Sequence, residues 1–345
     1  MLKNELIKLT AEIKSHLTKI KINLDMHDEV FKNDIVRQEE YLKEIQEKYS
    51  LLLDKSFEDS WSIIKTLNNV EYKEFKTHSF SELSPLLLFA EINNYIYNKP
   101  LGYPGDFRMM NYIYDYGDKY LGKSSYEKFV NYYTCRVPIC RCNRNRKEYL
   151  KENILKVILD NEHKKVVKMT SIASGAAREM LELLASGKID RDVELTLYDF
   201  ERKIEDYINL EYKKIPKKLK DKLKINYIFK DIKELILKNT VDDQLNGQDF
   251  IYSIGIFDYL PERVAIKMCK KIFGLLNEGG KMMLCNASEN NASHRAYYEV
   301  LGDWNMIYRN EDDFIRWGDS IGSHSRKNFG EPDSLKRYLY YFVSK

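Results

Sequence analysis

The 345-residue sequence carries 56 lysines and arginines against 53 aspartates and glutamates, which leaves a formal net charge of only +3. So close a balance argues against a dedicated nucleic-acid-binding protein, whose basic residues outnumber the acidic ones and cluster on one face. Hydrophobic residues make up 43% of the chain, which is enough for a sizeable core. The length suggests two domains, or one domain with a large appendage.

The N-terminus shows no uninterrupted apolar segment and no cleavage-site pattern. No window of the sequence reaches the roughly 18 apolar residues that a membrane span requires. The five cysteines form no even, regular framework of the kind that disulfide-rich secreted domains use. We therefore expect a cytoplasmic protein without a membrane span.

The first part of the chain, to about residue 95, predicts amphipathic helices. Its apolar residues recur at spacings of three and four, at Leu6, Leu9, Ile13, Leu17, Ile20 and Leu24. Two further helical segments are expected at 30–53 and 57–67. Such stripes are usual for a packing layer, and they also allow a homodimer through the N-terminal helices. We predict a helical N-terminal domain over residues 1–145.

From Arg146 onward, apolar strand-like runs alternate with helical segments. The strands are expected at 166–172, 193–198, 225–229, 249–254 and 281–285, with one more, antiparallel, at 335–343. Alternation at these lengths predicts a mostly parallel sheet that is covered by helices on both faces. Residues 146–345 are therefore expected to form a Rossmann-like α/β domain.

A turn of small residues follows the first strand, Ser174-Gly175-Ala176-Ala177. Small residues at the carboxyl end of a parallel strand let a ligand approach the backbone closely. The turn lacks the lysine of a phosphate-binding loop and the three glycines of a dinucleotide fingerprint. A nucleoside ligand without a pyrophosphate therefore fits best, although an ordinary strand-to-helix turn has the same appearance.

Two acidic residues end the second and third strands. Asp199 can accept hydrogen bonds from both hydroxyls of a ribose, because a carboxylate offers two acceptor oxygens to a diol. Asp231 can accept from an exocyclic amine, while Ile232 packs on a purine face. Each aspartate can instead cap the helix that follows it, and for Asp199 the two roles are compatible.

The segment Ile251–Leu260 and the turn Asn277-Glu278-Gly279-Gly280-Lys281 complete this pattern. The region from about Glu148 to Cys285 resembles the class I S-adenosylmethionine-dependent methyltransferases, except that the usual Gly-x-Gly turn keeps a single glycine. In that family the first turn holds the methionine end of the cofactor, and the acidic tip of the second strand holds the ribose. The resemblance implies cofactor contacts from Ser174, Gly175, Ala176, Glu179, Asp199, Phe200, Asp231, Ile232, Ser253, Ile254 and Gly255.

Three further motifs, 102–111, 255–261 and 303–309, together with Arg144-Asn145-Arg146, narrow the resemblance. They are similar to a bacterial subgroup with a helical N-terminal cap, which includes enzymes that make 3-hydroxy fatty acid methyl esters for quorum signalling. The loop 102–111 can be a packed turn between helices. It can also be a lid in which Tyr103 and Asp106 lie near the methionine end, with Asp106 paired to the amino group.

The acceptor decides which other residues take part. A carboxylate acceptor needs no general base, only a clamp such as the guanidinium groups of Arg144 or Arg309. A hydroxyl or amine acceptor needs a base, for which His294 and Asp258 are the candidates, oriented by Tyr259 or Tyr308. Phe257 is expected in the substrate site because the loop after the fourth strand faces the methyl group in this family.

No metal site is expected, because Cys135, Cys140 and Cys142 have no second pair of ligands near them in the sequence. The prediction is methyl transfer from S-adenosylmethionine to a small-molecule or fatty-acid-like acceptor, with the carboxylate of a 3-hydroxy fatty acid as the most specific candidate. Two alternatives stay open. One is an O- or N-methyltransferase of a specialised metabolite with His294 as base, and the other is a non-catalytic cofactor-binding scaffold with a helical interaction domain.

Overall fold

The computed structural model describes residues 4–117, 119–237, 242–290, 294–322, 328–330 and 337–345. The chain divides into two compact units. The helical unit comprises Met1–Arg141 together with Ala292–Asn305, and the sheet unit comprises Cys142–Asn291 with Met306–Lys345. The sequence placed the boundary between residues 145 and 146 and assigned the segment 292–305 to the second domain.

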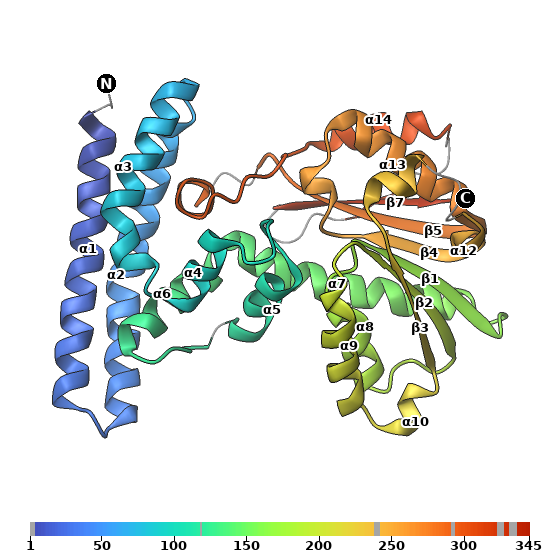
Figure 1. Cartoon of the computed structure of the whole chain (residues 1–345), viewed down its shortest axis with the longest axis horizontal. Coiled ribbons are helices and arrows are strands. Elements are labelled where there is room, and N and C mark those ends of the chain that lie inside the picture. The colour runs from blue at the N-terminus through green and yellow to red at the C-terminus, as the bar shows by residue number, and fades with distance from the viewer. Residues whose placement is uncertain (1–3, 118, 238–241, 291–293, 323–327, 331–336) are drawn as a thin grey trace. The chain divides into compact units, whose positions relative to one another are not determined.

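The helical unit begins with a long antiparallel hairpin of α1 (Asn4–Val30) and α2 (Ile35–Ile64), drawn in blue in Figure 1. The apolar stripe of α1 is buried, and Asp34 caps α2 by accepting from the backbone N–H of Arg37. The sequence predicted two segments where α2 is continuous. Neither glycine nor proline interrupts it, and Leu53 and Phe57, one turn apart, are both buried.

Shorter helices follow the hairpin in sequence. They are α3 (Asn69–Leu87), α4 (Glu91–Asn98), α5 (Phe107–Tyr116) and α6 (Ser125–Arg136), before α7 (Pro138–Asp160) crosses from one unit to the other. The capping box of Asn68 and Glu71 fixes the start of α3.

The segment 292–305 returns to the helical unit after the fifth strand of the sheet. Its described part forms a π-helix, η3 (Ala296–Leu301), in which Tyr297 is buried and shares hydrogen bonds with Asn93 and Thr134. Asp303 pairs with Lys76 and lies 3.6 Å from Lys99. These polar contacts explain why the segment belongs to the helices, although its neighbours in sequence belong to the sheet.

Among its described residues, the sheet unit holds seven strands in the order β3-β2-β1-β4-β5-β7-β6. The first five are parallel, and β7 and β6 are antiparallel additions. The strands are β1 (Val166–Ile172), β2 (Asp192–Asp199), β3 (Leu223–Phe229), β4 (Gln248–Ser253), β5 (Leu276–Ala287), β6 (Asn328–Gly330) and β7 (Tyr338–Ser344). This order confirms the predicted Rossmann-like α/β sheet with an antiparallel last strand. Leu335 and Lys336 of that prediction lie outside the described residues.

Helices lie between the strands in sequence and cover the sheet (Figure 1). They are α8 (Arg178–Ala185), α9 (Lys203–Lys214), α10 (Lys217–Lys220), α11 (Ile232–Leu237), α12 (Asp242–Leu245), the 3₁₀ turn η2 (Phe257–Tyr259), α13 (Glu262–Leu275) and α14 (Glu311–Ser320). Along β7, Tyr341 stacks on Phe314 of α14 while its neighbour Tyr340 packs on Tyr149 of α7. Because successive strand residues point to opposite faces, α14 and α7 cover opposite sides of the sheet.

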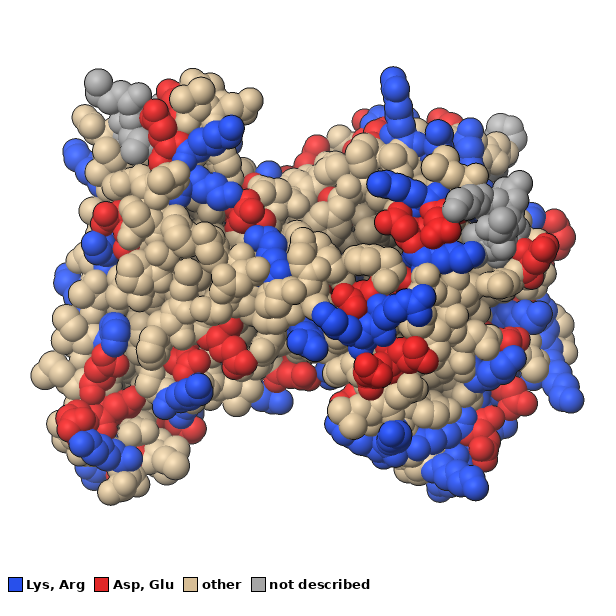
Figure 2. Space-filling model, viewed as in Figure 1, with Lys and Arg blue, Asp and Glu red and all other residues tan. Residues whose placement is uncertain are grey.

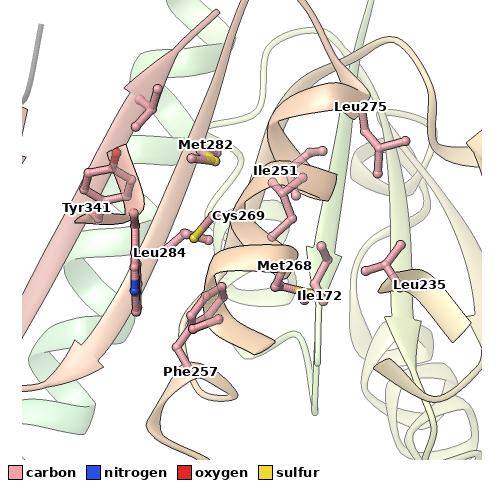
Figure 3. Close-up of a cluster of buried hydrophobic side chains, with 14 of the residues drawn as sticks. Ile172, Leu235, Ile251, Phe257, Met268, Cys269, Leu275, Met282, Leu284 and Tyr341 are labelled. Atoms are coloured by element: carbon pink, nitrogen blue, oxygen red, sulfur yellow. The ribbon is translucent and has the colours of Figure 1, made fainter. Parts of the chain in front are cut away.

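One large apolar cluster fills the space between the sheet and α11, α13 and α14 (Figure 3). Ile172, Ile251 and Leu284 of three neighbouring strands point into it, and Met268 and Cys269 of α13 meet them. Burial of each such side chain contributes about 1.5–3 kcal/mol, so this cluster holds the strand ends that carry the site in fixed register. No helix among the described residues is long and apolar enough to cross a membrane.

Candidate functional site

The turn between β1 and α8 has an unusual backbone. Ala173, Gly175 and Ala177 alternate in the left-handed region, with φ of 52°, 53° and 46°. Only glycine enters that region without steric cost, so the two alanines each carry a strain of about 1 kcal/mol. The N–H of Ala173 donates to the Tyr198 carbonyl at 2.8 Å, which ties the turn to β2. The chain thus keeps an alternating turn although the sequence has only one glycine in it.

Asp199 ends β2 directly beside this turn. Its carboxylate accepts from the backbone N–H of Gly175 at 2.9 Å and from that of Glu201 at 3.0 Å. Burial raises the pKa of Asp199, and these backbone hydrogen bonds offset the rise only in part. A carboxylate has about four lone-pair positions, so these backbone donors do not use all of its capacity to accept hydrogen bonds from a ligand. Phe200, the next residue, exposes 53% of its surface.

The residues of the turn fit a nucleoside cofactor. The Ser174 hydroxyl oxygen is buried and has no hydrogen-bond partner among the described residues. A buried hydroxyl of this kind costs free energy until it is paired, so a polar ligand group at the turn is favoured there. Ala176 beside it is buried and small. The unpaired hydroxyl, the close backbone and the Asp199 carboxylate together suit the polar end and the ribose of S-adenosylmethionine.

Glu179 lies in the first turn of α8 and is almost completely buried. Its Oε1 accepts from the Tyr252 hydroxyl of β4 at 3.0 Å, and burial raises the pKa of Glu179. Ser253 is also buried, and its hydroxyl donates to the Ile172 carbonyl at 3.0 Å. Both contacts fasten the end of β4 to β1 and α8. Ile254 and Gly255 follow Ser253 and are half-buried.

Asp231 follows β3 and is exposed. Its Oδ1 accepts from the Lys233 N–H at 2.7 Å, which is the helix-capping role considered from the sequence. Ile232 packs against the apolar cluster beneath the sheet. The carboxyl ends of β1, β2 and β3 therefore bring Ser174, Asp199 and Asp231 to one edge of the sheet, because the strands pair in parallel.

The loop after β4 corrects two sequence expectations. Phe257 was expected to meet the substrate, but its ring is fully buried in the apolar cluster, 5.1 Å from the Trp317 ring. Arg309 was expected to clamp a carboxylate, but it is 2% exposed and serves this loop internally. Its guanidinium donates to the carbonyls of Phe257 and Leu260 and to Asn286 at 2.5–2.7 Å. Its Nε also lies 3.3 Å from Oε2 of Glu262, so the guanidinium is engaged within the sheet unit rather than directed at a ligand.

Asp258 was expected to act as a base, and the structure gives it a structural role. It is 3% exposed, and its Oδ1 accepts from the Ala287 N–H at 2.6 Å. Oδ2 lies 3.8 Å from Arg146, which is also buried. Burial raises the pKa of Asp258 to about 6, against the opposing effects of Arg146 and the Ala287 hydrogen bond. The carboxylate thus joins the loop after β4 to the end of β5.

The loop 102–111 lies in the helical unit. Asp106 is buried and caps α5, accepting from the N–H groups of Arg108 and Met109 at 2.9 Å. The Tyr95 hydroxyl lies 3.1 Å from both of its oxygens. Burial raises the pKa of Asp106. Tyr103 is half-buried. The packed-turn interpretation accounts for these contacts, and the pairing of Asp106 with a cofactor remains a prediction.

His294 also lies in the helical unit, where sequence reasoning missed its partners. Its Nε2 is 2.9 Å from Oδ1 of Asp54 on α2. Asp54 further accepts from the Tyr133 hydroxyl at 2.9 Å and from Arg136 at 2.6 and 2.7 Å. We refer to these four residues as the Asp54 hub. Burial acts to raise the pKa of Asp54, but hydrogen bonds from His294 and Arg136 outweigh it and lower the pKa to about 2.

One sequence signal could have pointed to the Asp54 hub. Asp54 stands beside Leu53 and one turn from Phe57, on the buried stripe of α2. A carboxylate on such a stripe needs donors from elsewhere in the chain.

Among the remaining expected site residues, Arg144, Tyr259 and Tyr308 are half-buried. All five cysteines are buried, and the described residues hold no group of side chains suited to a metal ion.

No protein-family model matches the chain, and no curated protein matches it. Among solved structures, a possible exported protein from Bordetella parapertussis is 14% identical, and the match covers 75% of this chain and 84% of that one with a TM-score of 0.57. The magnesium protoporphyrin IX methyltransferase ChlM from Synechocystis PCC 6803 with bound SAH is 10% identical. That match covers 74% of this chain and 97% of ChlM, with a TM-score of 0.47. The likeness to the Bordetella protein shows a shared fold.

Proposed function

We propose that the protein transfers a methyl group from S-adenosylmethionine to a small-molecule or lipid-like acceptor. The observation that carries this proposal is the hydrogen bond of 2.9 Å from the Gly175 backbone N–H to Oδ2 of Asp199. It lies at the carboxyl edge of a Rossmann-like sheet. The buried, unpaired hydroxyl of Ser174 supports it, since a ligand at this turn would supply the missing partner. The bound sulfonium supplies an activated methyl group, so the protein needs mainly to align the acceptor with it.

The cofactor proposal is tested by calorimetric titration with S-adenosylhomocysteine. We expect Asp199→Asn to weaken binding by about 10- to 100-fold, because one charged acceptor for the ribose diol is lost. Asp192→Asn is the matched control, since Asp192 begins the same strand and is half-buried in an ion pair with Lys222. Equal affinities of wild type and Asp199→Asn would show that Asp199 does not hold the ribose.

For the acceptor, we propose the carboxylate of a 3-hydroxy fatty acid. A carboxylate is already a nucleophile and requires a cationic clamp rather than a base. Of the two candidate clamps, Arg309 is engaged inside the sheet unit. Arg144, which is half-buried on α7, is therefore the candidate that remains. The test is transfer of an isotopically labelled methyl group to 3-hydroxy fatty acids, followed by mass spectrometry. We expect Arg144→Gln to raise KM, whereas Arg141→Gln, exposed on the same helix, leaves it unchanged.

The alternative acceptor is a hydroxyl or amine of a specialised metabolite. The contact of His294 with Asp54 favours it, because a carboxylate that orients an imidazole is a common arrangement for a general base. Under this alternative His294→Ala abolishes turnover, while a carboxylate acceptor is methylated as before. His163→Ala, at an exposed position of the sheet unit, serves as control. Cofactor binding without a product from any acceptor pool would support the third candidate, a non-catalytic scaffold.

We also propose that two copies associate through the hairpin of α1 and α2. Ile22, Met26 and Val30 recur every four residues on α1 and expose 52%, 65% and 73% of their surfaces. An exposed stripe of this kind is a usual feature of helix–helix interfaces. Light scattering should give a dimer for the wild type and a monomer for Met26→Lys. Leu159→Lys, also exposed but on α7, should leave the dimer intact.

A further inference from the structure

We propose that the sheet unit docks on anionic membrane surfaces through a lysine-rich surface, formed by the exposed or half-buried lysines of residues 213–224. These lysines are Lys213, Lys214, Lys217, Lys218, Lys220, Lys222 and Lys224. Asp221 is the one acidic residue in this stretch. The segment therefore carries a net charge of about +6, more than the +3 of the whole chain, so the rest of the protein is nearly balanced.

The fold concentrates these charges in a small region. The end of α9, the single turn of α10 and the start of β3 follow one another within the segment, with Pro216 directly before α10. Figure 2 shows blue side chains gathered at the lower right, where α10 lies in Figure 1. In clusters of four to eight lysines, every lysine near the membrane surface contributes about 1 kcal/mol to the attraction toward anionic lipid headgroups.

Part of this charge is not neutralised within the protein. Lys214, Lys222 and Lys224 pair with Glu211, Asp192 and Glu194 at 2.7–3.4 Å. Lys213, Lys217 and Lys218 make no ion pair with any residue that the structure describes. All three are exposed, so their ammonium groups are available to an anionic partner.

An exposed leucine accompanies the lysines. Leu210 exposes 57% of its surface and lies on α9 three and four residues before Lys213 and Lys214. Residues at these spacings share one face of a helix. An apolar side chain among lysines is typical of segments that rest in the interface of a bilayer, where the leucine enters the acyl boundary and the cations meet the headgroups.

A nucleic acid fits this surface less well. The segment 213–224 contains no arginine, the residue that binds phosphate in a bidentate manner, and no aromatic residue. The nearest aromatic ring, Tyr212, directs its hydroxyl to the Lys220 and Leu223 carbonyls and is covered by the Lys220 ammonium at 5.2 Å. Its hydroxyl is thus held by the backbone and the Lys220 ammonium lies over one face of the ring, which makes it a poor platform for stacking a base.

The lysine surface is remote from the proposed cofactor site. Leu223 begins β3 and pairs with Val193, while Phe229 ends β3 and pairs with Asp199. Six residue steps at about 3.3 Å place the two ends of the strand roughly 20 Å apart. Changes to these lysines therefore leave the cofactor site intact, so membrane binding and methyl transfer can fail independently of each other.

The test is co-sedimentation of the full chain with vesicles of phosphatidylglycerol and phosphatidylcholine in equal parts, compared with pure phosphatidylcholine. We expect binding to the anionic vesicles alone, and its loss in about 0.5 M salt, where the screening length falls below about 5 Å. The triple variant Lys213→Gln/Lys217→Gln/Lys218→Gln should bind about a hundredfold more weakly. Leu210→Ser should weaken binding further while its salt dependence persists.

The control is Lys8→Gln/Lys19→Gln/Lys43→Gln, which removes the same charge from exposed positions of the helical unit. Binding of S-adenosylhomocysteine and the unfolding temperature show that each variant is folded. The proposal is overturned if wild type ignores anionic vesicles, or if both triple variants lose binding equally. It is also overturned if duplex or single-stranded DNA binds this surface in gel-shift titrations and the vesicles do not.

Discussion

In each unit of the protein a carboxylate lies beside basic residues, and the pKa values of these two carboxyl groups shift in opposite directions. In the helical unit, Asp54 accepts hydrogen bonds from Tyr133, Arg136 and His294, and its pKa falls to about 2. In the sheet unit, Asp258 accepts one backbone N–H, lies 3.8 Å from Arg146, and its pKa rises to about 6. A nearby arginine alone therefore does not decide the charge state.

The two pKa values differ because direct hydrogen-bond donors to the carboxylate oppose the effect of its desolvation. Burial penalises the ionised form in both cases, and direct hydrogen bonds and nearby positive charges offset that penalty. Asp54 has three side chains that donate to it, two of them able to carry charge, whereas Asp258 has a neutral backbone donor and an arginine beyond hydrogen-bond distance. Asp258 and Arg309 instead hold the loop after β4 in place, so these two buried charges have a structural role in the sheet unit.

Replacing Arg309 should have the largest effect on stability. We expect Arg309→Met to lower the free energy of unfolding by about 3–5 kcal/mol, because the carbonyls of Phe257 and Leu260 lose their donors in a buried site. Arg316→Met is the control. Arg316 is 54% exposed and pairs with Asp313 on the surface, so the change should cost under about 1 kcal/mol. Urea unfolding measures the stability of both variants. Equal losses of stability would contradict the structural role of Arg309 in the loop after β4.

Asp258→Asn tests the raised pKa. Because the folded-state pKa of about 6 lies above the ordinary value of 3.8, the folded protein binds this proton more readily than the unfolded chain. Acidification from pH 7 to pH 4 should therefore stabilise the wild type through this group by up to about 3 kcal/mol. The variant should lack that gain. The difference between the two unfolding curves at pH 7, 6 and 5 is the measurement, and a constant difference would show that Asp258 ionises normally.

Asp54→Asn tests the opposite sign. The folded-state pKa of about 2 lies below 3.8, so Asp54 contributes about 2 kcal/mol above pH 4, and this is lost as the pH falls through 2. We expect the variant to be less stable than wild type at pH 7, with a gap that narrows below pH 4. Asp59→Asn, exposed on the same helix, should show no such gap. A gap that is independent of pH would place the effect in packing rather than in charge.

The smallest effect concerns the strained turn of the sheet unit. Ala173→Gly should raise the free energy of unfolding by up to about 1 kcal/mol, because glycine adopts φ of 52° without steric cost. Ala185→Gly, at the end of α8, should have the opposite sign, since glycine weakens helices by about 1 kcal/mol. Two losses of equal size would indicate that Ala173 is not strained.

Much of the sheet unit could be predicted from its sequence. The apolar run 166–172 is β1 to the residue, and the five parallel strands come where the sequence predicted them, whereas β6, α10, α12 and α14 were not predicted. Apolar runs bounded by small or acidic residues leave few alternatives once burial on both faces is required. The closeness of Asp199 to Gly175 follows as well, because parallel strands end at a common edge.

The tertiary structure alone decided the rest. His294 and Asp54 are 240 residues apart in sequence, and Arg309 and Phe257 are 52 apart, so no local spacing indicates either contact. The family resemblance placed Phe257 near the substrate, and the chemistry of guanidinium made Arg309 a candidate clamp. Their burial shows that the loop itself uses them. Likewise, the segment 292–305 joins the helical unit through buried polar partners that its own sequence does not contain.

The sequence by itself determined the two-part organisation, the parallel sheet and the acidic strand end, because hydrophobic periodicity and turn residues act locally. The tertiary structure decided the left-handed backbone at Ala173 and Ala177 and the charge states of Asp54 and Asp258. These properties depend on how many donors and how little water surround a group, and that depends on residues brought together by folding.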